Sequence, residues 1–234
     1  MEQNENEFTL PIPGVRLFEK NEVLVLESEK ELFTLNSSIL GGGFYLPNFV
    51  VNKQVEKGYS GEDPTWDLIR GIEEIGLKPD ECVGMMTAAL VKHAAVKYEV
   101  ASQISVAAIV TAGTSNALAA GGTPPPFAFD SIGTINIILL IDGSLTEGGM
   151  VNAVITATEA KTMALQDLHI KDVFTGEPAS GTSTDAVVVA VTGKGEKMPY
   201  AGTATQLGGM IGRTVRKAVT EAMHRYLRYK ELHG

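Results

Sequence analysis

Apolar and polar residues alternate near the N-terminus of this 234-residue chain and give way to continuous apolar runs further along. Residues 15–40 contain three short alternating runs separated by charged residues, which is typical of a three-stranded β-meander. The pattern of residues 90–102 fits a strand or a helix equally well. Strands buried on both faces are predicted where almost every residue is apolar, over residues 83–89, 104–112, 135–141 and 187–191.

Capping signals predict where the helices begin. An Asp-Pro pair at 63–64 is a favourable start for a helix over residues 64–75. Ser144 and Glu147 have the spacing of a capping box, which predicts a helix to about residue 168, and a long C-terminal helix is expected over 207–231. The apolar face of the middle helix is expected to consist of Val151, Val154, Ile155, Thr158 and Leu165.

The order of these elements predicts an α+β fold of mixed α/β layers, in which β-sheets pack against two long helices. In the second half of the chain the predicted order is strand, helix, strand, helix. Hydrophobic residues make up 44% of the sequence, enough for the core of one domain over residues 1–234. We expect residues 1–40 to form an N-terminal β-meander and residues 41–234 to form the rest of that domain.

The charge and composition of the chain limit the kinds of molecule that it is expected to bind. The net charge of −9 makes nucleic acid an unfavourable partner. The single cysteine, Cys82, cannot form an intramolecular disulfide, and neither it nor the four histidines have the spacing of a zinc site. No run approaches the roughly 20 apolar residues that cross a bilayer, and the first ten residues are acidic. We therefore expect a cytoplasmic protein that binds no membrane and no metal.

Short segments rich in Gly, Thr, Ser, Asn and Asp adjoin the apolar runs. Small polar residues next to a core need hydrogen-bond partners, and loops at strand ends are where ligands usually bind. The segments therefore predict one polar site assembled from several loops. They are residues 110–116, 133–136, 152–159, 181–185 and 202–205.

The middle helix offers one candidate catalytic group. Asn152, Thr156 and Glu159 are spaced by four and three residues, so they should share one face of the helix. A carboxylate held among such side chains can act as a general base or acid. The alternative is an ordinary solvated helix face. Lys161 lies elsewhere on the same helix.

Asp185 is a second candidate, because it follows a run of hydroxyl residues and leads into a buried strand. It could orient a water molecule or a hydroxyl nucleophile, with Thr182 or Thr184 as the hydroxyl. The alternative is a turn residue whose carboxylate accepts hydrogen bonds from local backbone amides.

The loop after residue 112 is predicted to start a short helix that runs to residue 120. The first N–H groups of such a helix would be free to stabilise an oxyanion or a phosphate, although a simple helix cap is the alternative. Neither Gly-Lys-Ser nor Gly-Lys-Thr occurs in the chain, so nucleotide hydrolysis has little support. Arg213, near the glycine-rich start of the last helix, could reach an anionic ligand or could simply be solvated.

Six long motifs, in order along the chain, resemble the adenosylcobinamide amidohydrolase family. This resemblance implies hydrolysis of the amide that joins the aminopropanol arm to the corrin ring of adenosylcobinamide, giving adenosylcobyric acid for cobamide salvage. It implies no particular catalytic residue. The Thr-Ser-Thr-Asp segment also resembles a stretch of the ornithine acetyltransferase family, whose fold is an α-β-β-α sandwich. The six motifs span residues 44–52, 110–117, 133–142, 150–162, 181–189 and 200–213.

Combining the resemblance with the residues, we predict that Asp185 or Glu159 activates water or a threonine hydroxyl. Asn136 or Asn152, with backbone N–H groups of residues 113–116, would stabilise the oxyanion. Lys161 or Arg213 would assist the leaving amine or hold the polar edge of the corrinoid. Residues 124–127 are expected to wall the ring. The full predicted substrate-binding set is Tyr45, Thr111, Gly113, Thr114, Ser115, Asn116, Asn136, Thr203 and Arg213.

No cofactor is expected, because the corrinoid with its cobalt is the substrate. Whether the chain forms a homo-oligomer is left open by the sequence. Two other functions fit the same loops: a corrinoid-binding protein without hydrolytic activity, and an amidohydrolase or acyltransferase acting on a different amide.

Overall fold

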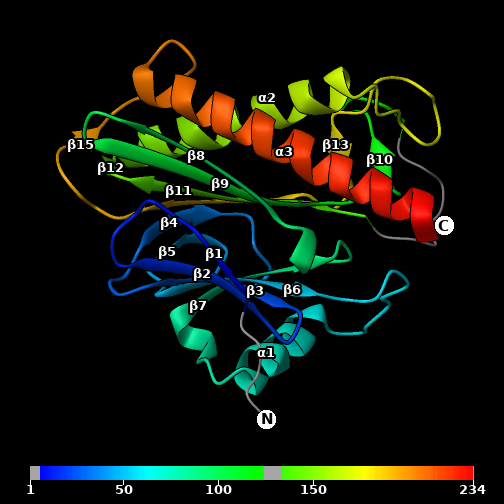
Figure 1. The fold of residues 1–234 in the computed structure, drawn as a ribbon, viewed down its shortest axis with the longest axis horizontal. Helices are drawn as coiled ribbons and strands as arrows, with labels where there is room; N and C mark the ends of the chain where they lie inside the picture. The colour runs from blue at the N-terminus through cyan, green and yellow to red at the C-terminus, as the bar shows by residue number, and fades with distance from the viewer. Residues whose placement is uncertain (1–5, 124–132, 234) are drawn as a thin grey trace.

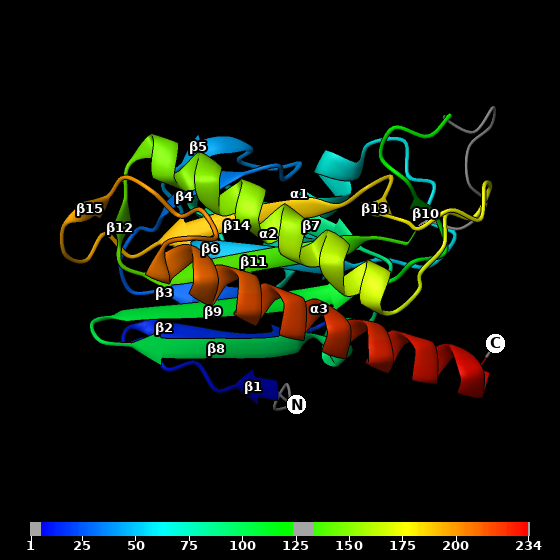
Figure 2. The ribbon, with the colours of Figure 1, turned by 90° about the horizontal axis from the view of Figure 1, so that it is seen from above.

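Two β-sheets lie face to face with helices on both outer sides, in a computed structural model that describes residues 6–123 and 133–233 (Figure 1). Helix α1 (Pro64–Glu74) covers the outer face of one sheet. Helices α2 (Glu147–Asp167) and α3 (Gln206–His233) cover the outer face of the other, side by side across its strands (Figure 2). The predicted α+β class is confirmed, and the layers are those of an α-β-β-α sandwich.

The first sheet has the strand order β1-β2-β3-β6-β7, in which only β6 and β7 are parallel neighbours. Its outer face packs on α1 through residues such as Val25, Val51 and Ile72. Its strands are β1 (Asn6–Phe8), β2 (Val15–Lys20), β3 (Val23–Ser28), β6 (Phe49–Gln54) and β7 (Cys82–Thr87).

The second sheet has the order β5-β4-β14-β11-β9-β8, and its central strand β11 is buried along its whole length. Strands β11 and β14 are parallel and are connected by the α2 crossover, which explains why both are continuously apolar. The strands are β4 (Phe33–Asn36), β5 (Gly43–Tyr45), β8 (Ala95–Ala101), β9 (Ile104–Ala112), β11 (Ile135–Asp142) and β14 (Ala186–Val191).

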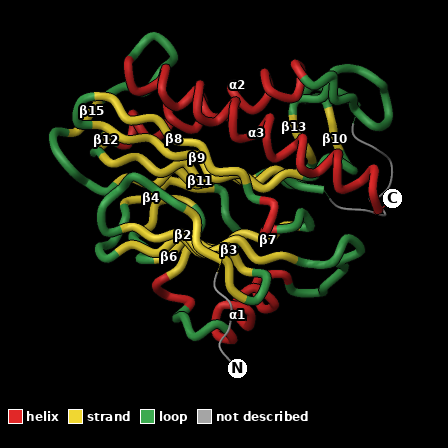
Figure 3. Tube along the Cα trace, in the orientation of Figure 1, coloured by secondary structure: helices red, strands yellow, loops and turns green. Residues whose placement is uncertain are grey.

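Two short strand pairs and two 3-10 turns complete the described elements (Figure 3). β10 (Ala117–Leu118) pairs with β13 (Gly181–Thr182), and β12 (Ser144–Leu145) pairs with β15 (Lys197–Met198). The 3-10 turns are η1 (Pro79–Glu81) and η2 (Val91–His93).

Alternation along β11 divides the core into two parts. Ile135 and Ile137 face the layer of α2 and α3, whereas Ile138 and Leu140 face the first sheet. The same alternation directs Asn136 into the space between the sheets. Side chains at the start of this strand are therefore sorted to opposite faces of the sheet.

The structure corrects the predicted meander. β2 and β3 pair as expected, but the third run forms β4, which pairs with β14 and β5 in the second sheet. The edge of β3 that β4 would have occupied is paired with β6 instead. Strands from residues 6–40 therefore belong to both sheets. Alternation of apolar and polar residues predicts that a segment forms a strand, but it does not predict which strand lies next to it.

Three local predictions are also settled. Residues 113–120 form no helix, since residues 117–118 pair as β10 with β13. The ambiguous segment 90–102 contains η2 and then strand β8. Helix α2 is capped by Thr146, whose hydroxyl accepts from the N–H of Gly149, while Ser144 lies in β12. The predicted capping box is therefore wrong.

The predicted apolar face of α2 is wrong in part: Leu165 is buried and Val154 packs against the core, but Val151, Ile155 and Thr158 are exposed. Val151 and Ile155 are about half exposed, at 47% and 49%. Instead the helix buries a face of small residues against α3 and the sheet, including Ala153, Ala157 and Ala164. Small side chains allow the helix backbone to approach its neighbours closely.

Candidate functional site

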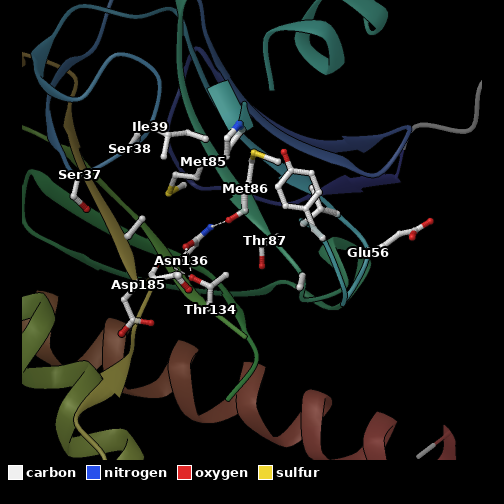
Figure 4. Close-up of a pocket in the computed structure, with 16 residues that line it drawn as sticks. Ser37, Ser38, Ile39, Glu56, Met85, Met86, Thr87, Thr134, Asn136 and Asp185 are labelled. Atoms are coloured by element: carbon white, nitrogen blue, oxygen red, sulfur yellow. Dashed lines mark hydrogen bonds between the residues drawn. The ribbon is translucent and has the colours of Figure 1, made fainter. Parts of the chain in front are cut away.

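A pocket opens at one end of the space between the two sheets, where β4 and β7 end and β11 and β14 begin (Figure 4). Its cavity volume is about 190 Å³. Apolar and polar groups share its lining, as is usual for small-molecule sites. The lining includes Ser37, Ser38, Ile39, Met85, Met86, Thr87, Thr134, Asn136, Thr184 and Asp185.

Asn136 anchors one wall of this pocket through a hydrogen-bond network that crosses between the sheets. Its Nδ2 donates to Asn52 Oδ1 at 2.9 Å and to the carbonyl oxygen of Met86 at 2.8 Å. Asn52 Nδ2 in turn donates to Thr111 Oγ1 at 2.9 Å. Both amide hydrogens of Asn136 are thus used inside the protein, which suits a side chain that positions its neighbours.

Thr134 lies next to Asn136 in the pocket and is only 2% exposed. Its hydroxyl lies 3.1 Å from Asn136 Oδ1 and 2.9 Å from the carbonyl oxygen of Thr184. The Thr184 hydroxyl donates to the carbonyl oxygen of Gly133 at 2.9 Å. The sequence reasoning did not select Thr134, although a spacing of two from Asn136 would have placed both on one face of the strand.

Three further hydroxyl groups in the lining retain unused hydrogen-bonding capacity. Ser38 Oγ is buried and, within the described residues, has no hydrogen-bond partner. Ser37 Oγ and Thr87 Oγ1 each accept one backbone N–H, from Val187 and Ala89, which leaves their hydroxyl hydrogens available. The sequence did not point to Ser37, Ser38 or Thr87 as site residues. The two serines fall in the first forty residues, which match the family motifs poorly.

Asp185 lines the edge of the pocket but directs its carboxylate toward the layer of α2 and α3 (Figure 4). The carboxylate accepts hydrogen bonds from Lys161 Nζ of α2, from the Thr182 hydroxyl at 2.6 Å, and from the backbone N–H groups of Thr182 and Ile135. The side chains of Lys161 and Asp185 are only 9% and 12% exposed. The fold therefore brings Lys161, which the sequence suggests separately on the middle helix, next to Asp185 and Thr182, which the sequence suggests as a pair.

The sequence profile of the adenosylcobinamide amidohydrolase family matches residues 11–231 of this chain. The chain belongs to this family. It is 31% identical to the adenosylcobinamide amidohydrolase of Methanosarcina mazei, over 86% of the chain and 93% of that protein. It is 37% identical to the Halobacterium salinarum protein of the same name over half of each chain, and 31% identical to an uncharacterised protein of Methanocaldococcus jannaschii over 92% of this chain and 90% of that one.

Solved structures are more distant. The L-aminopeptidase D-Ala-esterase/amidase of Ochrobactrum anthropi, described as a variant of the Ntn hydrolase fold, superposes with a TM-score of 0.45 and 12% identity over 94% of this chain and 83% of that one. The PH0078 protein of Pyrococcus horikoshii gives a TM-score of 0.47 and 11% identity over 96% and 83%.

In this member of the adenosylcobinamide amidohydrolase family, the other predicted carboxylate lies apart from Asp185. Glu159 is exposed in a depression between α2 and α3, which Thr203 and Arg213 also line. Arg213 forms a two-pronged ion pair with Glu99, at 2.9 and 2.6 Å, and this hydrogen-bonded guanidinium lowers the pKa of Glu99. Asn152 lies half-buried two turns before Glu159 on α2.

The loop after β9 supports the start of β11 instead of presenting a row of free N–H groups. The N–H of Gly113 donates to the carbonyl oxygen of Thr134, and Asn116 Oδ1 accepts from the N–H of Gly133, both at 2.9 Å. Asn116 is fully buried, and its Nδ2 donates to Ser183 Oγ at 2.8 Å.

The remaining predicted residues lie as follows. Thr114 donates its N–H to the hydroxyl oxygen of Tyr226, and Ser115 lies in the adjoining turn. Tyr45 donates its hydroxyl to the carbonyl oxygen of Asp80, at 2.9 Å. The predicted wall at residues 124–127 lies outside the described residues.

Over residues 6–123 and 133–233, no three His, Cys, Asp or Glu side chains lie close enough together to hold a metal ion. No helix within those ranges is both long and apolar enough to cross a bilayer.

Proposed function

We propose that this protein hydrolyses the amide between the aminopropanol arm and the corrin ring of adenosylcobinamide, releasing adenosylcobyric acid for cobamide salvage. Family membership over residues 11–231 supports the substrate. The inter-sheet pocket is the observation that supports the location of the active site, because residues from two distant family motifs, 133–142 and 181–189, line it. A pocket with mixed apolar and polar walls suits an arm of a ring that carries many carboxamides.

Asp185 lies at the edge of the pocket with its carboxylate turned toward Lys161 and Thr182. We therefore assign proton transfer to Asp185 and place the scissile amide at this edge, where it reaches the Asp185 carboxylate and the Thr182 hydroxyl. The nucleophile is either water or the Thr182 hydroxyl, which already donates to Asp185 at 2.6 Å. Attack on the amide carbonyl passes the nucleophile's proton to the carboxylate, which returns it to the departing amine. If Thr182 is the nucleophile, a water molecule then hydrolyses the ester formed on it.

Ser38 gives the proposal a substrate contact. A buried hydroxyl without a partner is unfavourable unless a ligand satisfies it, and a carboxamide of the corrinoid supplies both a donor and an acceptor.

The chelator-treated wild-type protein is incubated with adenosylcobinamide, and adenosylcobyric acid is followed by mass spectrometry. Ser38→Ala should raise KM without lowering Tm, because the hydroxyl removed has no partner in the protein.

Ser37→Ala alters the neighbouring hydroxyl of the same pocket and, unlike Ser38→Ala, should lower Tm slightly, since it removes an acceptor for the Val187 N–H. Thr182→Ala separates the two nucleophiles, because turnover survives only if water attacks. Corrinoid binding without product, also after divalent cations are added, would overturn the proposal in favour of a carrier protein.

A further inference from the structure

A second cavity lies beside the inter-sheet pocket and shares Val55, Glu56 and Ala88 with it. Its cavity volume is about 360 Å³. Its walls come from the segments after β6 and β7 and from the C-terminal half of α3. The two cavities are therefore neighbours, with these three residues lining both.

The two cavities differ in chemistry. Hydroxyl, amide and thioether groups line the inter-sheet pocket, whereas His93, Tyr226 and Tyr229 line the second cavity. The rings of His93 and Tyr229 meet edge to face, with their centroids 5.5 Å apart. Small or aliphatic residues also line the cavity, namely Ala88, Ala89, Leu90, Ala112 and Ala222, together with the polar Gln54, Glu56 and Lys57. One face of the Tyr229 ring stacks on His233, with centroids 4.3 Å apart, and Lys57 Nζ lies 5.8 Å from the centroid of the Tyr229 ring. Such walls suit a flat aromatic group with polar edges.

The polar atoms of this cavity also suit a nucleobase. Burial, followed by the nearby Lys92 and Arg225 charges, lowers the pKa of His93, so its imidazole is neutral at pH 7 and offers one donor and one acceptor. The Tyr226 hydroxyl accepts the Thr114 N–H, which leaves its own hydrogen free to donate. Purine edges present both donors and acceptors.

We infer that the cavity lined by His93, Tyr226 and Tyr229 binds the adenosyl nucleoside of the substrate, while the inter-sheet pocket holds the arm with the scissile amide. This inference rests on the proposed function and adds a basis for substrate discrimination. Stacking of a base on an aromatic side chain contributes enough that its removal weakens binding roughly 5- to 100-fold. The nucleoside subsite therefore favours adenosylated cobinamide over cobinamide that carries a small upper ligand.

The test compares kcat/KM for adenosylcobinamide with kcat/KM for cyanocobinamide in the wild type, Tyr229→Leu and His93→Ala. We expect the wild type to prefer the adenosylated substrate, and the ratio of the two values to fall roughly 5- to 100-fold in Tyr229→Leu. Tyr98→Leu, which alters a tyrosine 52% exposed on β8, is the matched control and should keep the ratio. Calorimetric titration with 5′-deoxyadenosine should detect binding to the wild type that Tyr229→Leu weakens.

The outcomes separate the two proposals. A wild type that hydrolyses adenosylcobinamide, with a ratio and a nucleoside affinity unchanged in both cavity variants, overturns the nucleoside subsite and leaves the proposed function standing. A wild type that hydrolyses neither corrinoid, yet binds 5′-deoxyadenosine through Tyr229, overturns the proposed function.

Discussion

At the scale of single residues, Asp185 has a structural role that is independent of the chemistry proposed for it. Its carboxylate is surrounded by donors from three segments, and it neutralises Lys161 in a region nearly closed to water. A buried charge that loses its partner keeps its desolvation cost without the compensating attraction. The ion pair therefore ties α2 to the start of β14, whatever its part in proton transfer.

Asp185→Asn should lower the free energy of unfolding by about 3–5 kcal/mol at pH 7, because it strands the Lys161 ammonium. Urea denaturation measures the loss. Adding Lys161→Met should restore part of the stability but no turnover, if Asp185 transfers the proton. Glu159→Gln is the control on the same helix and should change stability by less than about 0.5 kcal/mol, since Glu159 is exposed. An Asp185→Asn variant as stable as the wild type would refute this reading.

At the scale of elements, α2 shows why local patterns can misplace a helix. Ser144-x-x-Glu147 has the letters of a capping box, but Thr146 also precedes an acidic first turn, and it is Thr146 whose hydroxyl caps the helix. The large apolar residues Val151 and Ile155 were expected on the buried face, because a periodic pattern assigns large apolar side chains to the core. Both are about half exposed. Close contact with α3 selected the alanine face instead.

Thr146→Ala should therefore lower the free energy of unfolding by about 1 kcal/mol, whereas Thr146→Ser should keep the cap and most of the stability. Thermal or urea denaturation of the two variants checks this. A larger loss from Thr146→Ser than from Thr146→Ala would show that the methyl group, and not the hydroxyl, stabilises this position.

At the scale of the whole molecule, four layers enclose three hydrophobic clusters, and Cys82 lies in the one between the first sheet and α1. Cys82 is fully buried, and burial raises the pKa of its thiol to about 12. Thiolates, not thiols, react with alkylating reagents. The thiol thus reports on opening of the outermost layers.

Cys82 should resist iodoacetamide at pH 8 in the native protein and react readily in urea, as mass spectrometry of the labelled chain would detect. Because its folded pKa lies above the ordinary value of 9.0, its contribution to stability is fully present below about pH 9 and is lost as the pH rises toward 12. Cys82→Ala should make stability less sensitive to pH over that window. Rapid native labelling at pH 8 would contradict this account of a closed core.

The sequence by itself determined the continuous strands, the two long helices, the family and two of the segments that line the pocket, 133–136 and 181–185, because alternation, capping and motifs are local properties of the chain. Strand pairing in the tertiary structure decided which of these side chains meet at the pocket. Register sets Asn136 opposite Ala186, so Asp185 lies beside Ile135 on the helix side of the sheet while Thr134 and Asn136 face the pocket. The partner of Asn136 is Asn52, 84 residues away in the other sheet. Such contacts depend on which strands become neighbours, and local patterns carry no information about that choice.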